Sequence, residues 1–190
     1  LVNIFRRIAD DNWKIIYTHA NTVNNQYMGQ GVTIQDGIAL YSNRGADPNG
    51  VTDAGEVYAY KLDGNKVTYL ATITAGTPKA YDGFGTYLTF RDNFLFAQSI
   101  GGDDPANNSG YINILERVSD TDWQERGIVT TKFTEQNIQF GGVISVYQNY
   151  LVASHHLLAN SAQSEYGHGG AGFYEFKEPI MLANSSHTNK

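Results

Sequence analysis

The sequence repeats itself with a constant step. A segment that begins at Phe84-Gly85 returns in closely related form at Phe140-Gly141, and a weaker copy begins at Met28-Gly29. The glycines at positions 29, 85 and 141 are separated by two equal steps of 56 residues. A constant step of this length is typical of tandem supersecondary units, each of which buries its apolar face against the next. The chain is therefore predicted to fold as a row of similar units.

Each unit has the pattern of four short β-strands, which we name A to D in chain order. Apolar and β-branched runs alternate with turns rich in Gly, Asp and Asn, and no stretch keeps the apolar spacing of an amphipathic helix for more than one turn. Four antiparallel strands per tandem unit predict an all-β fold made of β-propeller blades. The expected strands lie at 32–34, 38–41, 56–61 and 67–73 in the first full unit and at 87–90, 94–97, 111–115 and 123–131 in the second.

The ends of the chain do not coincide with the ends of a unit. Residues 1–13 align without a gap to residues 111–123, which places the start of the chain at strand C of an earlier blade and makes Trp13 equivalent to Trp123. Recurrence of a tryptophan at one repeat position predicts that both pack within or between blades. We expect about three and a half blades, with further blades from a longer chain or a second subunit because closed propellers have at least four. The expected division is 1–28, the end of a preceding blade; 29–84 and 85–140, two blades; 141–183, an incomplete blade with a possible strand D at 180–183; and 184–190, a polar tail.

The repeat motif resembles a known family. Phe84-Gly85 is followed by Gly110-Tyr111-Ile112-Asn113-Ile114, and Phe140-Gly141 by Gly172-Phe173-Tyr174-Glu175-Phe176. This pattern is similar to the FG-GAP repeat of integrin α chains and many bacterial surface proteins, with a degenerate first copy in which Met28 replaces Phe. The resemblance implies a propeller with a binding or adhesion role outside the cell or at its surface. Residues 1–7 lack the apolar core of a signal peptide, so we expect a targeting segment to lie upstream or to have been removed.

The turns between strands A and B argue against the calcium loops that the resemblance would otherwise imply. These turns, at 35–37, 91–93 and 147–149, are short and carry at most one carboxylate each, whereas calcium takes six to eight oxygen ligands. Asp47, Asn49 and Asp53 could begin a separate calcium loop, but Gly50 falls too early for the usual register. The sequence therefore predicts no metal and no other cofactor.

Charge and composition exclude several classes of partner. The net charge is −6, and 13 Lys and Arg residues are scattered along the chain, so a nucleic-acid partner is not expected. No apolar run approaches the roughly 20 residues that span a bilayer. Cysteine is absent, which excludes disulfides and thiolate metal sites.

The long loops are predicted to carry the binding site. The D–A loops (19–27, 75–83 and 132–139) and the B–C loops (42–55, 99–110 and 154–172) emerge on the same face of a propeller, and binding residues concentrate on long loops of a rigid scaffold. The candidate ligand-binding residues on these loops are Tyr27, Arg44, Asp47, Asp53, Tyr81, Asp103, Asp104, Asn107, His156, Tyr166 and His168.

Each group of candidates has a structural alternative. Asp47 and Asp103 stand in turn sequences, where an aspartate commonly caps the turn. Tyr27, Tyr81 and Tyr166 either stack on a sugar ring or fill the space between blades. His156 and His168 belong, with His155, to the one histidine cluster of the loops, but adjacent histidines on a strand point to opposite sides.

Three functions remain open at this stage. The first is a non-catalytic binding or adhesion module that recognises a glycan or a protein, and the second is a purely structural scaffold. The third is part of a polysaccharide-degrading enzyme that uses a carboxylate pair among the loop aspartates. No nucleophile or metalloprotease motif is present, so we expect no catalytic activity.

Overall fold

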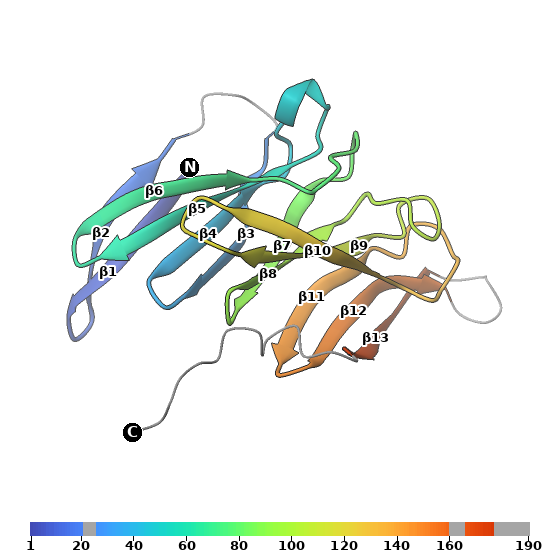
Figure 1. Ribbon diagram of the computed structural model, residues 1–190. Helices are drawn as coiled ribbons and strands as arrows, with labels where there is room; N and C mark the ends of the chain where they lie inside the picture. The colour runs from blue at the N-terminus through green and yellow to red at the C-terminus, as the bar shows by residue number, and fades with distance from the viewer. Residues whose placement is uncertain (21–25, 160–165, 177–190) are drawn as a thin grey trace.

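The computed structural model describes residues 1–20, 26–159 and 166–176, and these form an all-β structure of four antiparallel sheets (Figure 1). One three-residue 3-10 helix, η1 (Pro48–Gly50), interrupts the strands. We number the sheets 1 to 4 along the chain. They contain β1 (Val2–Ala9) and β2 (Asn12–His19); β3 (Met28–Gln35), β4 (Ile38–Asn43), β5 (Glu56–Asp63) and β6 (Lys66–Ile73); β7 (Phe84–Arg91), β8 (Phe94–Ser99), β9 (Tyr111–Arg117) and β10 (Trp123–Thr130); and β11 (Phe140–Tyr147), β12 (Tyr150–Ala159) and β13 (Tyr166–Glu175).

The predicted strands of the two full units are confirmed. Each of the eight expected runs coincides with one strand of sheet 2 or sheet 3, and only residue 131 lies outside its strand. In both sheets the strands pair in chain order, each antiparallel to the next. The possible strand at 180–183 lies outside the described residues. Among the described residues, no helix is long and apolar enough to cross a membrane.

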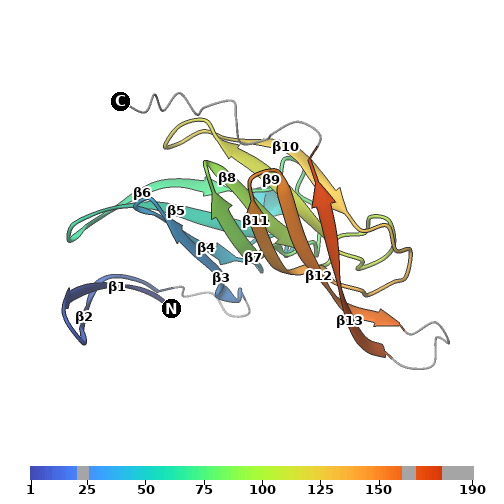
Figure 2. The ribbon, with the colours of Figure 1, turned by 90° about the horizontal axis from the view of Figure 1, so that it is seen from below.

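The four sheets follow one another in a row (Figure 2). The first strand of sheet 3, β7, contacts β3 and β4 of sheet 2, and the first strand of sheet 4, β11, contacts β7 and β8. Sheet 1 and sheet 4 lie at opposite ends of this row in both views. Within the described part of the chain, the row does not close into a ring.

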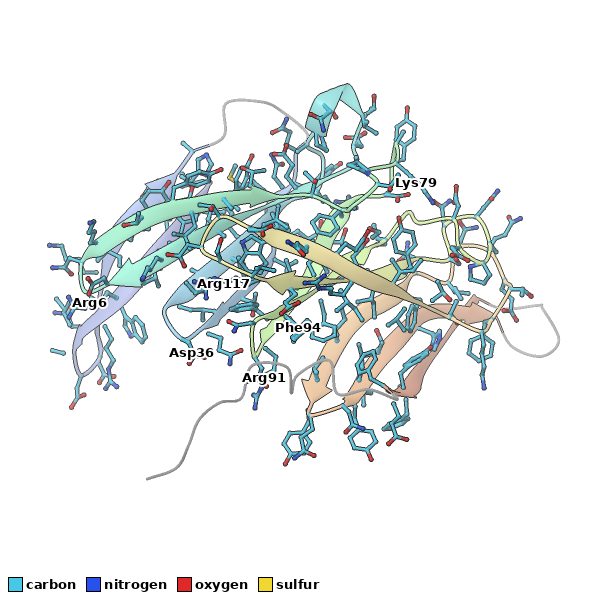
Figure 3. The ribbon with its side chains drawn as sticks, viewed as in Figure 1. Arg6, Asp36, Lys79, Arg91, Phe94 and Arg117 are labelled. Atoms are coloured by element: carbon cyan, nitrogen blue, oxygen red, sulfur yellow. The ribbon has the colours of Figure 1, made fainter. Side chains whose placement is uncertain are left out.

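The short turns lie at one end of the strands, and the long loops lie at the other end. A two-residue turn joins the first two strands of each of these sheets: Asp36-Gly37 in sheet 2 and Asp92-Asn93 in sheet 3. All four residues have positive φ, between 48° and 75°. Such turns match the natural twist of a hairpin, and Gly, Asn and Asp tolerate this conformation best. Figure 3 shows Asp36 and Arg91 at the end of the strands where the short turns lie, and Lys79 on the long β6–β7 loop at the opposite end. The hairpin turns predicted at these positions are confirmed.

Two apolar clusters join sheets 2, 3 and 4. One lies between sheets 2 and 3 and includes Leu40, Phe84 and Leu95, and the other lies between sheets 3 and 4 and includes Phe96 and Phe140. The second strands of sheets 2 and 3, β4 and β8, are buried along their whole length because other parts of the chain cover both faces. Burial of the apolar side chains of these clusters is the main contribution to the stability of such a stack of sheets.

The glycines of the 56-residue step are required at the sheet junctions. Their φ values lie between +82° and +90°, a region that disfavours residues with a Cβ. A Cβ at each would also meet a strand C residue of the preceding sheet. The atoms concerned, each at 2.8 Å, are Cγ2 of Val2 for Gly29, Cγ2 of Val57 for Gly85 and Cγ1 of Ile112 for Gly141. Because these partners stand at equivalent repeat positions, β1 packs on Gly29 as β9 packs on Gly141.

The third B–C loop differs from its prediction. Residues 154–172 were expected to form a long loop, but β12 extends to Ala159 and β13 begins at Tyr166, with Leu158 paired to His168. His156, Tyr166 and His168 therefore lie on strands. The first two B–C loops contain prolines, which cannot donate to a strand ladder, whereas no proline occurs between 154 and 172, so pairing continues.

The two equivalent tryptophans have different environments. Trp123 packs in the cluster between sheets 2 and 3, with its ring centre 5.6 Å from that of Phe90. Trp13 is largely exposed, because the face of sheet 1 that carries it is uncovered in the described structure. The packing prediction is therefore correct for Trp123 and wrong for Trp13.

Candidate functional site

An open cleft lies where the long loops of sheets 2 and 3 meet. It has a volume of about 450 Å³, and its charged and aromatic lining residues are Tyr27, Arg44, Asp53 and Tyr81, all of them candidates from the sequence. Tyr27 precedes β3, Arg44 follows β4, Asp53 precedes β5 and Tyr81 precedes β7. Residues from three loops, β2–β3, β4–β5 and β6–β7, thus line one site.

Backbone hydrogen bonds fix the loops of this cleft against each other. The N–H of Tyr81 donates to the carbonyl oxygen of Thr52 at 2.9 Å, and the N–H of Gly83 donates to that of Asp53 at 3.0 Å. These bonds tie the β6–β7 loop to the β4–β5 loop at successive positions. The cleft is therefore largely formed before a ligand arrives, which reduces the entropy that binding must overcome.

Three of the lining residues have strained backbones. Tyr27, Asp53 and Tyr81 have φ values of 50°, 50° and 67°, in the left-handed region where a side chain is unfavourable. Each such residue costs roughly 1–2 kcal/mol, and strain of this kind clusters at functional sites. Asn108, Asn137 and Gln139 have the same conformation at the next junction, so this strain belongs to the repeated loop backbone.

The side chains of the cleft offer both flat apolar surface and charge. Tyr27 is 57% exposed and Tyr81 is 68% exposed. The guanidinium carbon of Arg44 lies 4.3 Å from the ring centre of Tyr27, a cation–π arrangement that orients both groups. The Nε of Arg44 is buried and has no hydrogen-bond partner among the described residues. With the Asp53 carboxylate, the cleft therefore presents aromatic faces, hydrogen-bond donors and an acceptor.

Asp47 and Asp103 hold loops rather than line the cleft. Oδ1 of Asp47 accepts a hydrogen bond from the N–H of Asp53 at 2.7 Å, and Oδ1 of Asp103 accepts one from the N–H of Asn108 at 2.8 Å. The two aspartates stand 56 residues apart and make the same contact in consecutive B–C loops. This geometry matches the turn-capping alternative considered for both.

The next junction, between sheets 3 and 4, repeats the backbone of the cleft with different side chains. Asn108 repeats the φ value of Asp53, and Asn137 has a φ of 61° where Tyr81 has 67°. The N–H of Asn137 donates to the carbonyl oxygen of Asn107 at 3.0 Å, as the N–H of Tyr81 donates to that of Thr52. At the positions equivalent to Tyr27 and Arg44 this junction has Gly83 and Ile100. The aromatic and charged lining is therefore specific to the junction between sheets 2 and 3.

The remaining candidates lie elsewhere. Asp104 and Asn107 belong to the β8–β9 loop and are not among the residues that line the cleft. His156 lies on β12, and Tyr166 and His168 lie on β13. The side chains of these three are outside the described structure. Of the eleven residues predicted from the sequence to bind a ligand, four line this cleft: Tyr27, Arg44, Asp53 and Tyr81.

Asp82 was not among the residues predicted from the sequence, although it lies between two residues that line the cleft. Its side chain is buried and accepts a hydrogen bond from the hydroxyl of Tyr111. Burial raises the pKa of Asp82, an effect that this hydrogen bond and the charge of Lys79 partly offset. Burial also raises the pKa of Tyr111. Gln26 and Ile138 stand at the positions equivalent to Asp82 in the other two units. This difference between the units is the sequence feature that could have identified Asp82.

A second groove, of about 380 Å³, lies beside β13 and includes Thr131, Lys132 and Phe133 in its lining. His155 stands at its base, buried, with Nε2 3.0 Å from Oγ1 of Thr131. Burial and the charge of Lys132 lower the pKa of His155, so the ring is neutral at physiological pH. Its role in the described structure is to join the β10–β11 loop to β12.

No group of three or more His, Asp or Glu side chains that could hold a metal ion occurs within residues 1–20, 26–159 and 166–176. The chain matches no protein-family model, and a search of curated proteins finds no relative. The cleft geometry therefore supplies the evidence for function.

Proposed function

We propose that this protein is a non-catalytic binding module that recognises a glycan in the cleft between sheets 2 and 3. The observation that carries the proposal is the lining of this cleft: two exposed tyrosines together with Arg44 and Asp53. A binding site needs a few polar groups placed on a largely preformed surface, and the loop hydrogen bonds provide that surface.

The chemistry of the lining suits a sugar better than a compact ion or an apolar ligand. A pyranose has a face of C–H groups and an edge of hydroxyls. Tyr81 and Tyr27 can cover the C–H face, as aromatic rings do for other flat apolar surfaces. Arg44 donates and Asp53 accepts hydrogen bonds, and such charge-assisted bonds to hydroxyls are stronger than neutral ones. An open cleft also admits one segment of a longer chain.

We further propose that the sheets are consecutive blades of a β-propeller of FG-GAP type. The equal step, the shared strand order and the same glycine contact at each junction support this arrangement. An extracellular or cell-surface adhesion role follows from that resemblance and forms part of the proposal.

Binding to a glycan array, followed by calorimetric titration of the best ligand, tests the proposal. Tyr81→Ala and Asp53→Asn are each expected to weaken binding about tenfold or more, which corresponds to about 1.4 kcal/mol. Tyr147→Ala is the matched control, because Tyr147 is an exposed tyrosine on β11 that does not line the cleft. An array without binding above background would refute the proposal, and so would affinity that survives the loss of both Tyr27 and Tyr81.

A further inference from the structure

The outer face of sheet 4 exposes positions that the repeat otherwise buries. In sheet 3, Phe94 and Ile114 face sheet 4 and are only 6% and 4% exposed. By strand register, their equivalents in sheet 4 are Tyr150, the first residue of β12, and Phe173, which pairs with Val152 as Ile114 pairs with Phe96. This register replaces the match of Phe173 with Tyr111 that the sequence motif predicted. Tyr150 is 49% exposed and Phe173 is 83% exposed. This face therefore has the apolar character of a sheet-to-sheet interface but no cover among the described residues.

The outer face of sheet 1, at the other end of the row, also exposes residues whose equivalents in sheet 3 pack against another sheet. Leu115 and Trp123 pack against sheet 2 from sheet 3, and Leu115 is 1% exposed. Their equivalents in sheet 1 are Phe5 and Trp13, which are 52% and 61% exposed. The opposite face of sheet 1 packs on sheet 2, where the hydroxyl of Tyr17 donates to that of Tyr60 at 3.0 Å. Sheet 1 thus has one face in use and one free.

We propose that a second copy of this chain associates head to tail, with its sheet 1 covering sheet 4 of the first copy. The partner is inferred from the junctions between sheets within the chain. There, the face equivalent to the one that carries Tyr150 and Phe173 meets the face equivalent to the one that carries Phe5 and Trp13. Both ends are thus the two halves of an interface of the kind that joins successive sheets within each chain. Aromatic residues at such positions commonly dominate the energy of protein–protein contacts.

The contact differs from a symmetric pairing of identical patches. A head-to-tail contact is heterologous, and it either closes into a ring or extends into a chain of copies. Each copy carries a net charge of −6, so like-charge repulsion opposes association. Salt screens that repulsion and leaves the apolar contact intact, and association should therefore become tighter as ionic strength rises.

Sedimentation velocity across micromolar concentrations tests the contact. Phe173→Asp and Trp13→Asp are each expected to raise the dissociation constant at least tenfold. Circular dichroism checks that both remain folded, which is expected because both side chains are exposed in the single chain. Ile34→Asp is the control, since Ile34 is an exposed apolar residue on β3, inside the row, and association should be unchanged.

Mixing the two variants separates the proposed contact from a symmetric one. The Trp13→Asp copy retains an intact sheet 4 and the Phe173→Asp copy an intact sheet 1, so the mixture should form dimers that neither variant forms alone. A monomer at all concentrations would overturn the proposal. So would self-association that only one of the two variants weakens, or a mixture that stays monomeric.

Discussion

Replacing Gly85 by alanine is expected to destabilise the protein by about 2–5 kcal/mol. The backbone at Gly85 has a φ of +90°, and an L-residue in this region costs roughly 1–2 kcal/mol. The added Cβ would also lie 2.8 Å from Cγ2 of Val57 and 2.9 Å from Cβ of Ser42, and an overpacked junction costs about 1–3 kcal/mol more. The sum is a large part of the 5–15 kcal/mol that typically stabilises a domain.

Gly50→Ala separates the two contributions. Gly50 has a similar φ, +80°, but no atom lies within 4 Å of where its Cβ would be. This variant should lose only the conformational part, roughly 1–2 kcal/mol. Guanidinium unfolding followed by tryptophan fluorescence measures both variants, because Trp123 lies in the cluster that the Gly85 junction joins. If Gly85→Ala cost no more than Gly50→Ala, the packing argument would be refuted.

A double-mutant cycle with Val57→Ala tests the named contact. Val57→Ala alone removes buried methyl groups and should destabilise the protein, since Val57 is fully buried in the same cluster. In the Gly85→Ala background the same change also relieves the 2.8 Å approach, so it should cost less. The expected coupling is about 0.5–3 kcal/mol, and strictly additive effects would show that another neighbour of Gly85 carries the strain.

Three further substitutions test particular contacts. Because burial raises the pKa of Asp82, the native state binds more protons than the unfolded state, and the free energy of unfolding falls as pH rises from about 4. In urea titrations, the stability of Asp82→Asn relative to wild type should therefore increase toward neutral pH, and a constant difference would contradict this. Burial raises the pKa of Tyr60 to about 12. Tyr60→Phe also removes the hydrogen bond with Tyr17, so it should cost about 1 kcal/mol at neutral pH, and the deficit should shrink between about pH 10 and 12; a deficit that did not shrink would oppose this. Gln98→Leu removes a bond from buried Nε2 to the carbonyl oxygen of Phe140 at 2.7 Å and should cost about 1–3 kcal/mol by thermal unfolding, unlike a change at an exposed glutamine.

The strands and short turns could be predicted because they depend on local chemistry. Asp36-Gly37 and Asp92-Asn93 are residue pairs that tolerate positive φ, and the apolar runs beside them have strand length. The third B–C loop could not be predicted, because its length depends on how far β12 and β13 continue to pair, and pairing is decided across the sheet. The burial of Asp82 likewise depends on Tyr111, 29 residues away.

The candidate cleft is best understood through the positions where the repeat changes its side chains. Asp47 and Asp103 recur because each caps the same loop, and the three junction glycines recur because each admits a strand C residue. Tyr27 and Arg44 do not recur: the same backbone carries glycine and isoleucine one step later. These recurring residues maintain the backbone that the units share, whereas a residue that a ligand needs can occur once. The junction between sheets 2 and 3 carries such single residues on a backbone that the next junction repeats, and this is why the ligand is assigned there and not to the loops in general.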